Sequence, residues 1–483
     1  MRMNRTTVAV VLLTCVALLF FMVAHEIVSA LPPSPTSTPR PIAANTHPPT
    51  ALPSPRATPM ASPTPTPTLQ PTATSRPTAT ASPTAGPVGF GYWHTDGTRI
   101  VDASGRTVRI AAITWYGMES SYWVPAGLDY QPYTAIMDRI KGLGYNTIRL
   151  PYSNELVESD PIVTQAVKAN PQFLGVHALK VMDAIVNYAH TIGLKIILDD
   201  HRCRAGRPKT VNLLDEPRWY TAQYPDSSWI ADWKFLAKRY AGNDAVIGVD
   251  LRNEPHTSGP GPWNLHAYLY QGSIWGPYDG VTYPHSDWRL AAERGGDAVL
   301  SVNPHLLIFV EGVQLYPDSS RSSGVDSYWW SGILSPVRQY PVVLTVPHQL
   351  VYSPHDWGPW KWEMSWFKGM TYASMQRVWH NEWSFILDDP HSPYAAPIWL
   401  GEFGTCTSNP KCVDEQQGDN QATWFHLLLR YLQEHPTVGW SFYALNGTNS
   451  NDHAANNGIL TPTWDGVANE NLQQDLSSIE PHG

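Results

Sequence analysis

The chain of 483 residues is long enough for two or three average domains, or for one large barrel with additional segments. Its net charge of −9 is spread along the sequence without a basic block, so we expect no nucleic-acid partner. Only 15% of the residues are charged and 21 are tryptophan, a composition that fits a protein for neutral, ring-shaped ligands.

Residues 1–30 have the pattern of an export segment. Arg2 and Arg5 precede an apolar run over residues 8–24, and residues 28–30 resemble a cleavage site with small side chains, which predicts a signal peptide. The run is also just long enough to cross a membrane, so an uncleaved anchor is the alternative. In either case we expect a secreted or extracellular protein, attached to the cell envelope if residues 8–24 remain as a membrane tether.

Residues 31–87 are dominated by proline, threonine, serine and alanine. Such a segment cannot form a hydrophobic core, so it predicts a disordered, extended linker. No folded module is predicted before it, and the linker would therefore lead only to the export segment. A stalk of this kind favours the membrane-anchor alternative.

Residues 88–483 have the composition of a globular domain. Turn signals at Asp96-Gly97 and Ser104-Gly105 separate β-prone runs and predict a short N-terminal β-hairpin pair that covers one end of the fold.

Strands and helices alternate in the rest of this domain. The predicted strands span residues 109–116, 146–151, 194–199, 245–251, 306–310, 350–354, 397–400 and 438–444. The predicted helices span residues 133–143, 177–191, 229–240, 287–302, 375–387, 421–434 and 471–479. This alternation predicts eight β/α units, and hence a (β/α)8 TIM barrel of the α/β class.

Two of the predicted strands are followed by a glutamate. Residues 245–251 lead into Asn253-Glu254-Pro255, where the proline ends regular strand pairing, and residues 397–400 lead into Glu402. The carboxyl ends of barrel strands meet on one face, so the two glutamates should converge there. A pair of carboxylates is what hydrolysis of a glycosidic bond requires.

Glu311 follows a third predicted strand. Its carboxylate could touch substrate or a catalytic partner, or it could be a structural, hydrogen-bonded acid at a strand end. We favour the structural role and leave Glu311 outside the predicted catalytic set.

The four cysteines favour one local disulfide. Cys406 and Cys412 flank a short segment after Glu402, and in an exported chain we expect them to pair. Cys203 has no evident partner. The sequence shows no clustered Cys/His spacing, so we predict neither a metal nor a cofactor.

Five motifs occur in an order that resembles glycoside hydrolase family 5, particularly its cellulase subgroup. They are NTIRLP (146–151), DDHR (199–202), NEPH (253–256), YSPHD (352–356) and LGEFG (400–404). The resemblance extends over residues 88–465. It implies a retaining β-glycosidase on a (β/α)8 barrel, most often an endo-β-1,4-glucanase.

The resemblance also implies roles for single residues. Glu254 would be the general acid/base and Glu402 the nucleophile, with Arg149 donating two hydrogen bonds that keep Glu402 ionised. Asn253 would bond the sugar 2-hydroxyl, and histidines would orient the substrate and the carboxylates. The implied substrate-binding residues are Arg149, His201, Asn253, His355, Trp357 and Tyr443.

Two positions depart from the family pattern. Trp357 stands where the family usually has a tyrosine that bonds the nucleophile, and an indole N–H reaches differently from a phenol. Tyr443 stands where a tryptophan usually forms the floor beneath the reacting sugar, and Trp440 is the less favoured candidate for that floor. These changes put the rate and the preferred substrate in doubt more than the reaction type.

Aromatic residues in the predicted loops suit a cleft for a long glucan, since sugar rings pack on indoles. They are Trp115, Tyr116, Trp123, Trp263, Trp275, Trp329, Trp330, Trp357, Trp360 and Trp362. We expect a monomer that hydrolyses a β-glucan polysaccharide. One alternative is a retaining hydrolase for mannan, xyloglucan or mixed-linkage glucan. The other is a non-catalytic carbohydrate-binding barrel, against which the intact set of Glu254, Glu402 and Arg149 argues.

Overall fold

The computed structural model describes residues 89–206, 216–257, 272–278, 280–320, 324–416, 418–448 and 455–481. The predicted export segment (1–30) and the predicted linker (31–87) lie outside these residues. Within the part of the chain that is described, every helix is too short or too polar to cross a membrane.

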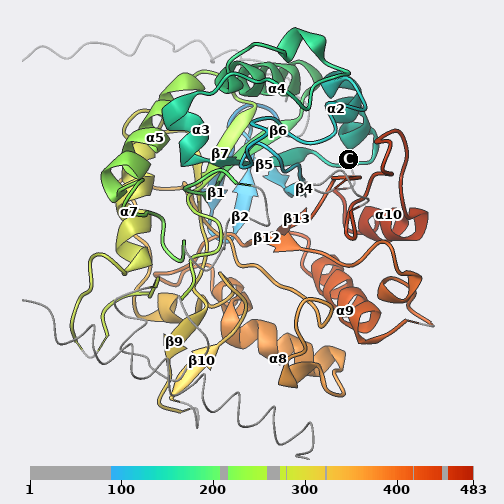
Figure 1. The fold of residues 1–483 in the computed structure, drawn as a ribbon. Coiled ribbons are helices and arrows are strands. Elements are labelled where there is room, and N and C mark those ends of the chain that lie inside the picture. Colours follow the sequence, from blue (N-terminus) through green and yellow to red (C-terminus); the bar gives the residue numbers. More distant parts are fainter. Residues whose placement is uncertain are drawn as a thin grey trace, which may run out of the picture. The chain divides into compact units, whose positions relative to one another are not determined.

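Eight parallel strands form the barrel, with helices around them (Figure 1). They are β4 (Ala111–Thr114), β5 (Thr147–Ser153), β6 (Lys195–Arg202), β7 (Val246–Asp250), β8 (Leu307–Val310), β11 (Leu350–Tyr352), β12 (Trp399–Phe403) and β13 (Gly439–Phe442). Their order is β11-β8-β7-β6-β5-β4-β13-β12, and parallel bridges Tyr352–Ile398 and His355–Glu402 join β11 to β12 and close the ring. The predicted (β/α)8 barrel is confirmed.

The strands are apolar because both of their faces are covered. Every residue of β7 is buried, as expected of a parallel strand between the barrel interior and a layer of helices. The helices are α2 (Tyr133–Gly142), α3 (Asn154–Ser159), α4 (Ala178–Ile192), α5 (Asp226–Arg239), α7 (Trp288–Leu300), α8 (Tyr372–Glu382), α9 (Asn420–Glu434) and α10 (Glu470–Ser477). In α4, buried Val181, Met182, Ile185 and Val186 repeat at helical spacing and form its inner face.

The predicted count of eight β/α units is one too high, since none of the seven predicted helices lies between residues 310 and 350 and the described residues there contain no α-helix. They contain the antiparallel pair β9 (Leu315–Pro317) and β10 (Val325–Ser327), followed by a 3-10 turn (Ser335–Arg338). The helix predicted for residues 375–387 also ends early, since α8 stops at Glu382 and a 3-10 turn (Ser384–Leu387) follows.

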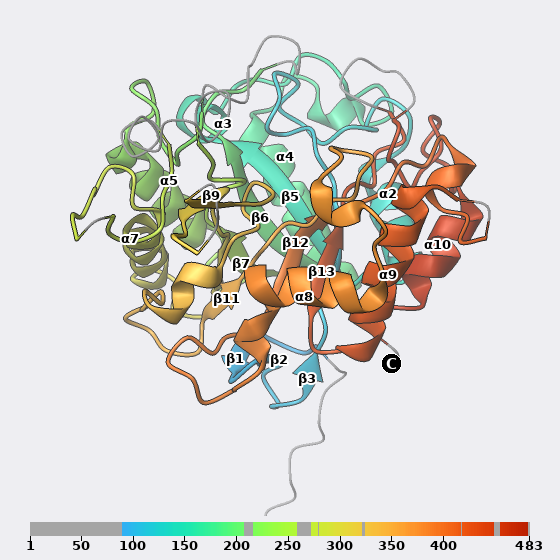
Figure 2. The ribbon, with the colours of Figure 1, turned by 90° about the horizontal axis from the view of Figure 1, so that it is seen from below.

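An N-terminal antiparallel sheet closes one end of the barrel. It consists of β1 (His94–Asp96), β2 (Arg99–Val101) and β3 (Thr107–Val108), which confirms the predicted hairpin pair. Figure 2 shows these strands below the barrel strands. Trp93, only 2% exposed, packs in a cluster with Ile197, Phe309 and Trp399 from the barrel interior. The sheet leaves the carboxyl ends of the barrel strands as the face on which a site can open.

The predicted disulfide is present. Cys406 and Cys412 are bonded with their Cα atoms 5.6 Å apart, so they tie down the segment that follows β12. Cys203 is a buried free thiol that lies against the backbone carbonyl of Trp219.

Candidate active site

Glu254 and Glu402 meet at the carboxyl ends of the barrel strands. Glu254 lies beyond the end of β7 in the left-handed backbone region, with φ +49°, whereas Glu402 lies within β12 rather than after a strand ending at residue 400. One carboxylate oxygen of Glu254, one of Glu402 and one ring nitrogen of His355 all lie within 4.8 Å of one another. Both glutamates line a cleft of about 1530 Å³. Inverting glycosidases, which need room for an attacking water, hold their two carboxyl groups about 6.5–9.5 Å apart.

Arg149 on β5 connects Glu402 to the buried groups beneath the cleft. Its Nη1 donates to Glu402 Oε1, while Nε and Nη2 donate to Asp250 Oδ2 at 3.0 and 2.9 Å. Nη2 also donates to Asn253 Oδ1 at 2.9 Å. The expected second hydrogen bond from Arg149 to Glu402 is therefore wrong, because the other donors of the guanidinium are directed at Asp250 and Asn253.

His355 lies behind the two glutamates. It is fully buried and does not line the cleft; its Nδ1 is 3.1 Å from Glu254 Oε1 and 3.8 Å from Glu402 Oε2. Burial disfavours the charged imidazole, but Glu311 and Glu402 raise the pKa of His355 well above its ordinary value. A charged His355 donates from its ring and contacts the carboxylates rather than the cleft.

The pKa values of the two glutamates respond differently to these neighbours. Burial raises the pKa of Glu402, while His355 and Arg149 act against that rise. Burial also acts to raise the pKa of Glu254, but the hydrogen bond and charge of His355 lower it overall. These directions are the reverse of the predicted assignment, in which Glu402 is ionised and Glu254 carries the proton. The assignment therefore rests on the hydrogen bond from Arg149 to Glu402 and the contact of His355 with Glu254.

The other predicted substrate-binding residues lie on the cleft wall. His201 pairs through Nδ1 with Asp199 Oδ2 at 2.8 Å and faces the cleft, as does Asn253. The rings of Trp357 and Tyr443 are nearly perpendicular with centroids 6.0 Å apart. Among the described residues, neither of these two rings forms a hydrogen bond with Glu402.

Tyr116 extends the wall beside Tyr443. The two rings stack with centroids 5.6 Å apart. Buried Asn446 fixes the backbone of Tyr116: its Oδ1 accepts from the Tyr116 N–H at 3.3 Å and its Nδ2 donates to the Tyr116 carbonyl at 3.0 Å. The position of this ring is therefore set by an amide from the loop after β13.

The predicted aromatic set lies partly in the cleft and partly in the core, while Trp123 and Trp360 are half-buried against the core without lining the cleft. The members that line the cleft are Tyr116, Trp329, Trp330, Trp357 and Trp362. Trp115 and Trp275 are instead buried, and their indole N–H groups bond backbone carbonyls of Ala126 and Tyr340. Trp440 is also buried, and Trp263 lies outside the described residues. Tyr122, Tyr130 and Tyr328, which are not in the predicted set, line the cleft as well.

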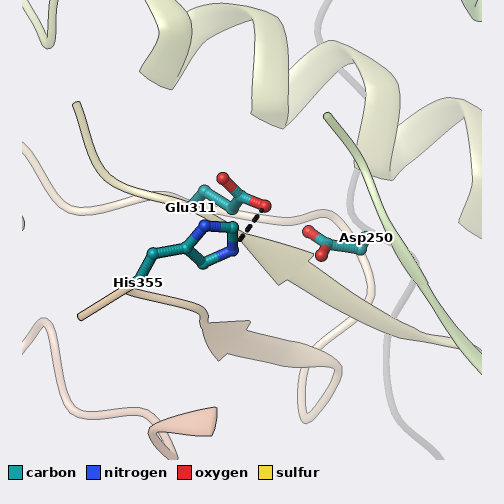
Figure 3. Close-up of side chains that lie close together, drawn as sticks. All are labelled: Asp250, Glu311 and His355. Atoms are coloured by element: carbon teal, nitrogen blue, oxygen red, sulfur yellow. Dashed lines mark ion pairs between the residues drawn. The ribbon is translucent and has the colours of Figure 1, made fainter. Parts of the chain in front are cut away.

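Asp199 and Asp250 were not predicted as part of the site, but they form a buried cluster with Glu311, His355 and Arg149. Asp250, Glu311 and His355 have ligand atoms within 4.8 Å of one another, and Figure 3 shows them at the ends of neighbouring strands. Asp199 lies 3.2 Å from Arg149 in the same cluster. The positive charges that these acids face are the guanidinium of Arg149 and the imidazole of His355, and we assign no metal to them. Two residues in the sequence could have indicated this cluster: Asp199, the first aspartate of the DDHR motif, and Asp250, which ends β7.

A closed parallel barrel with a glutamate pair, a buried arginine and an aromatic cleft at its carboxyl-terminal face defines the class of barrel glycoside hydrolases. Residues 101–449 match the family model "Cellulase (glycosyl hydrolase family 5)". The chain belongs to glycosyl hydrolase family 5.

Individual relatives agree with this family. The chain is 37% identical over 376 residues to an endoglucanase of Paenibacillus polymyxa, across 77% of this chain and 83% of that protein. It is 29% identical to the major extracellular endoglucanase of Xanthomonas campestris pv. campestris, across 80% of this chain and 71% of that protein. A solved complex of an endocellulase from Pyrococcus horikoshii with cellotetraose superposes with a TM-score of 0.68 at 30% identity, over 82% of this chain and all of that one.

Proposed function

We propose that the protein hydrolyses internal β-1,4-glucosidic bonds of cellulose or related β-glucans by a retaining double displacement. The observation that carries this proposal is the glutamate pair, whose oxygens approach within 4.8 Å in a cleft of about 1530 Å³. Retaining enzymes hold their two carboxyl groups roughly 5–5.5 Å apart, whereas inverting enzymes need a wider gap for water. The relatives named endoglucanase and the cellotetraose-bound neighbour support a β-1,4-glucan as the substrate.

In the proposed reaction, Glu402 attacks the anomeric carbon and Glu254 donates a proton to the departing glycosidic oxygen. The hydrogen bond from Arg149 stabilises the charge of Glu402 before the attack. In the second step Glu254 removes a proton from water, which attacks the glycosyl-enzyme and frees Glu402. His355, bonded to Glu254, fixes the orientation of the group that transfers the proton.

Residues of the cleft wall would orient the sugar. In this proposal Asn253 bonds the 2-hydroxyl, held in place by its contact with Arg149, and His201 orients another substrate hydroxyl. Trp357 and Tyr443 would provide the aromatic surfaces beside the reacting ring. Mannan, xyloglucan or mixed-linkage glucan is the second candidate substrate, favoured by the departures at these two aromatic positions. Reducing-sugar release from carboxymethyl-cellulose, mannan and xyloglucan, measured side by side, separates these substrates.

We further propose that the protein acts outside the cell as a monomer on its polysaccharide. The relative from Xanthomonas campestris is called extracellular, which supports export. Residues 1–30 would serve as the signal peptide or membrane anchor, residues 31–87 as the linker, and residues 88–483 as the catalytic domain.

Azide rescue tests the roles of the two glutamates. Glu254→Ala should cripple β-glucan hydrolysis but spare the first step on an aryl glycoside with a good leaving group, so that glycosyl-enzyme accumulates. Added azide should then restore turnover and give a β-glycosyl azide, because a small anion needs no general base. Glu402→Ala should lose turnover on every substrate. With azide added it should give the α-azide, because azide attacks the anomeric carbon directly from the space that the Glu402 side chain occupied.

The anomeric form of each azide product, read by NMR, decides the assignment. The opposite pair of anomers would exchange the two roles. Full activity in both variants would show that the chemistry lies elsewhere in the protein.

A further inference from the structure

Glu311 is a buried acid next to the glutamate pair, and the proposed reaction uses none of its atoms. Figure 3 shows its side chain facing His355. Each of its oxygens has two partners. Oε2 accepts from the backbone N–H of Glu254 at 2.6 Å and from the hydroxyl of Ser331. Oε1 lies 3.2 Å from His355 Nε2 and 3.4 Å from Arg149 Nη2. Both oxygens of the Glu311 carboxylate therefore have their partners in Glu254 and in residues around it.

The first pair of contacts holds the main chain of residue 254. Glu254 has φ +49° and Ser331 has φ +66°, in the left-handed region that residues other than glycine rarely adopt. Both residues donate to the same oxygen of Glu311. One carboxylate oxygen therefore fixes the turn that carries the side chain of Glu254 into the cleft.

The second pair of contacts reaches the side chain of residue 254. The imidazole of His355 lies between Glu311 Oε1, 3.2 Å from its Nε2, and Glu254 Oε1, 3.1 Å from its Nδ1. With both ring nitrogens protonated, one imidazolium faces a carboxylate on each side. The charged groups around this imidazole are Arg149, Asp199, Asp250, Glu254, Glu311 and Glu402.

We propose that Glu311 is the positioning residue of the acid/base Glu254. One of its oxygens fixes the main chain of residue 254, and the other fixes the carboxyl group of the same residue through His355. The inference rests on the proposed role of Glu254 and assigns to Glu311 more than the structural role favoured by the sequence.

Two aryl cellobiosides test this role in the full-length protein. Dinitrophenolate leaves without a proton, whereas phenolate needs the general acid, and kcat/KM reports the first step for both substrates. Glu311→Gln should lower kcat/KM for phenyl cellobioside roughly 10- to 100-fold, a part of the usual contribution of a general acid. It should leave kcat/KM for 2,4-dinitrophenyl cellobioside nearly unchanged.

The pH profile gives a second readout that a purely structural role would not move. Glu311→Gln removes an anion that raises the pKa of His355, so His355 loses its proton at lower pH. The charge of His355 lowers the pKa of Glu254, and its loss lets Glu254 keep its proton to higher pH. The alkaline limb of kcat/KM for phenyl cellobioside should therefore move to higher pH.

Asp287→Asn is the matched control. Asp287 is also a buried carboxylate that accepts a backbone N–H, from Gly276 at 3.0 Å, but it caps α7 and does not line the cleft. Its loss should lower the melting temperature without changing the ratio of the two kcat/KM values or the alkaline limb.

Equal losses on both cellobiosides with an unmoved alkaline limb would overturn the role of Glu311. If Glu311→Gln does not fold, Ser331→Ala decides, because it removes a donor to the same oxygen and leaves all charges in place. Ser331→Ala should lower kcat/KM for phenyl cellobioside and leave kcat/KM for 2,4-dinitrophenyl cellobioside unchanged. An unchanged ratio of these two kcat/KM values would overturn the inference. A wild-type protein without activity on any β-glucan would instead overturn the proposed function itself.

Discussion

At the scale of single residues, Asp250 shows how the buried charge beneath the cleft is arranged. One of its oxygens accepts two hydrogen bonds from Arg149, while the other has no hydrogen-bond partner among the described residues. Burial and the nearby Glu311 raise the pKa of Asp250 well above its ordinary value. The charge of Arg149 acts against that rise, so the ion pair and the burial of Asp250 oppose each other.

We expect substitutions at Asp250 to depend on whether an oxygen acceptor remains. Asp250→Asn should lower the free energy of unfolding by less than about 1.5 kcal/mol, the usual contribution of one hydrogen bond. Asp250→Ala leaves the Arg149 Nε–H without an acceptor and should cost about 3–5 kcal/mol. Urea unfolding of both variants measures the difference. Equal losses would show that an ionised Asp250 is needed.

The sequence located the glutamate pair for a clear physical reason. Parallel barrel strands end on one face, so residues that follow them converge there, as Glu254 and Glu402 do. The targets of the five donors of Arg149 could not be predicted, because Asp250 and Asp199 lie within strands and their contacts depend on the pairing register. The positioning of Glu311 against the Glu254 N–H likewise depends on the left-handed turn, which no local pattern marked.

At the scale of elements, the barrel strands were predicted from their apolar runs, and β1, β2 and β3 from the turn signals that separate them. β9 and β10 were missed because each has three residues, too few for any periodicity. The eight barrel strands were found because their apolar runs recur between helices. Trp93 could not be identified as the closing side chain of the barrel, since its partners Ile197, Phe309 and Trp399 are brought together only by closure.

Trp93→Ala tests whether the N-terminal sheet stabilises the barrel from below. Trp93 is 2% exposed, and removing so large a buried side chain should lower the free energy of unfolding by about 3–5 kcal/mol. The cleft lies at the other end of the strands, so kcat on a soluble β-glucan should not change. Chemical unfolding and initial rates measured on the same preparations check both parts. A loss of kcat without a loss of stability would contradict the expectation that the N-terminal sheet stabilises the fold and does not affect catalysis.

At the scale of the whole molecule, the barrel holds every residue of the candidate site. The carboxylates, Arg149 and the cleft aromatics come from elements between β4 and the loop after β13. The division into residues 1–30, 31–87 and 88–483 stays a prediction from composition.

Deletion of residues 31–87 should leave both the melting temperature and the turnover of soluble substrate nearly unchanged. A segment of proline, threonine and serine lacks the apolar side chains needed to stabilise a fold by burial. Differential scanning calorimetry and initial rates on carboxymethyl-cellulose check the two quantities. A large drop in melting temperature would show that this segment packs on the catalytic domain.

The amide of Asn446 has a consequence for the choice of expression host. Residues 446–448 read Asn-Gly-Thr, an acceptor sequence for N-linked glycans in hosts that attach them. In the folded chain Asn446 is fully buried and its Nδ2 donates to the Tyr116 carbonyl, so the nitrogen that would carry a glycan is enclosed. Glycan transfer before folding would prevent this contact and displace Tyr116 from the cleft wall. A yeast or insect secretion system should therefore yield a folded fraction that is unmodified at Asn446, and Asn446→Gln would not be a neutral way to remove the acceptor.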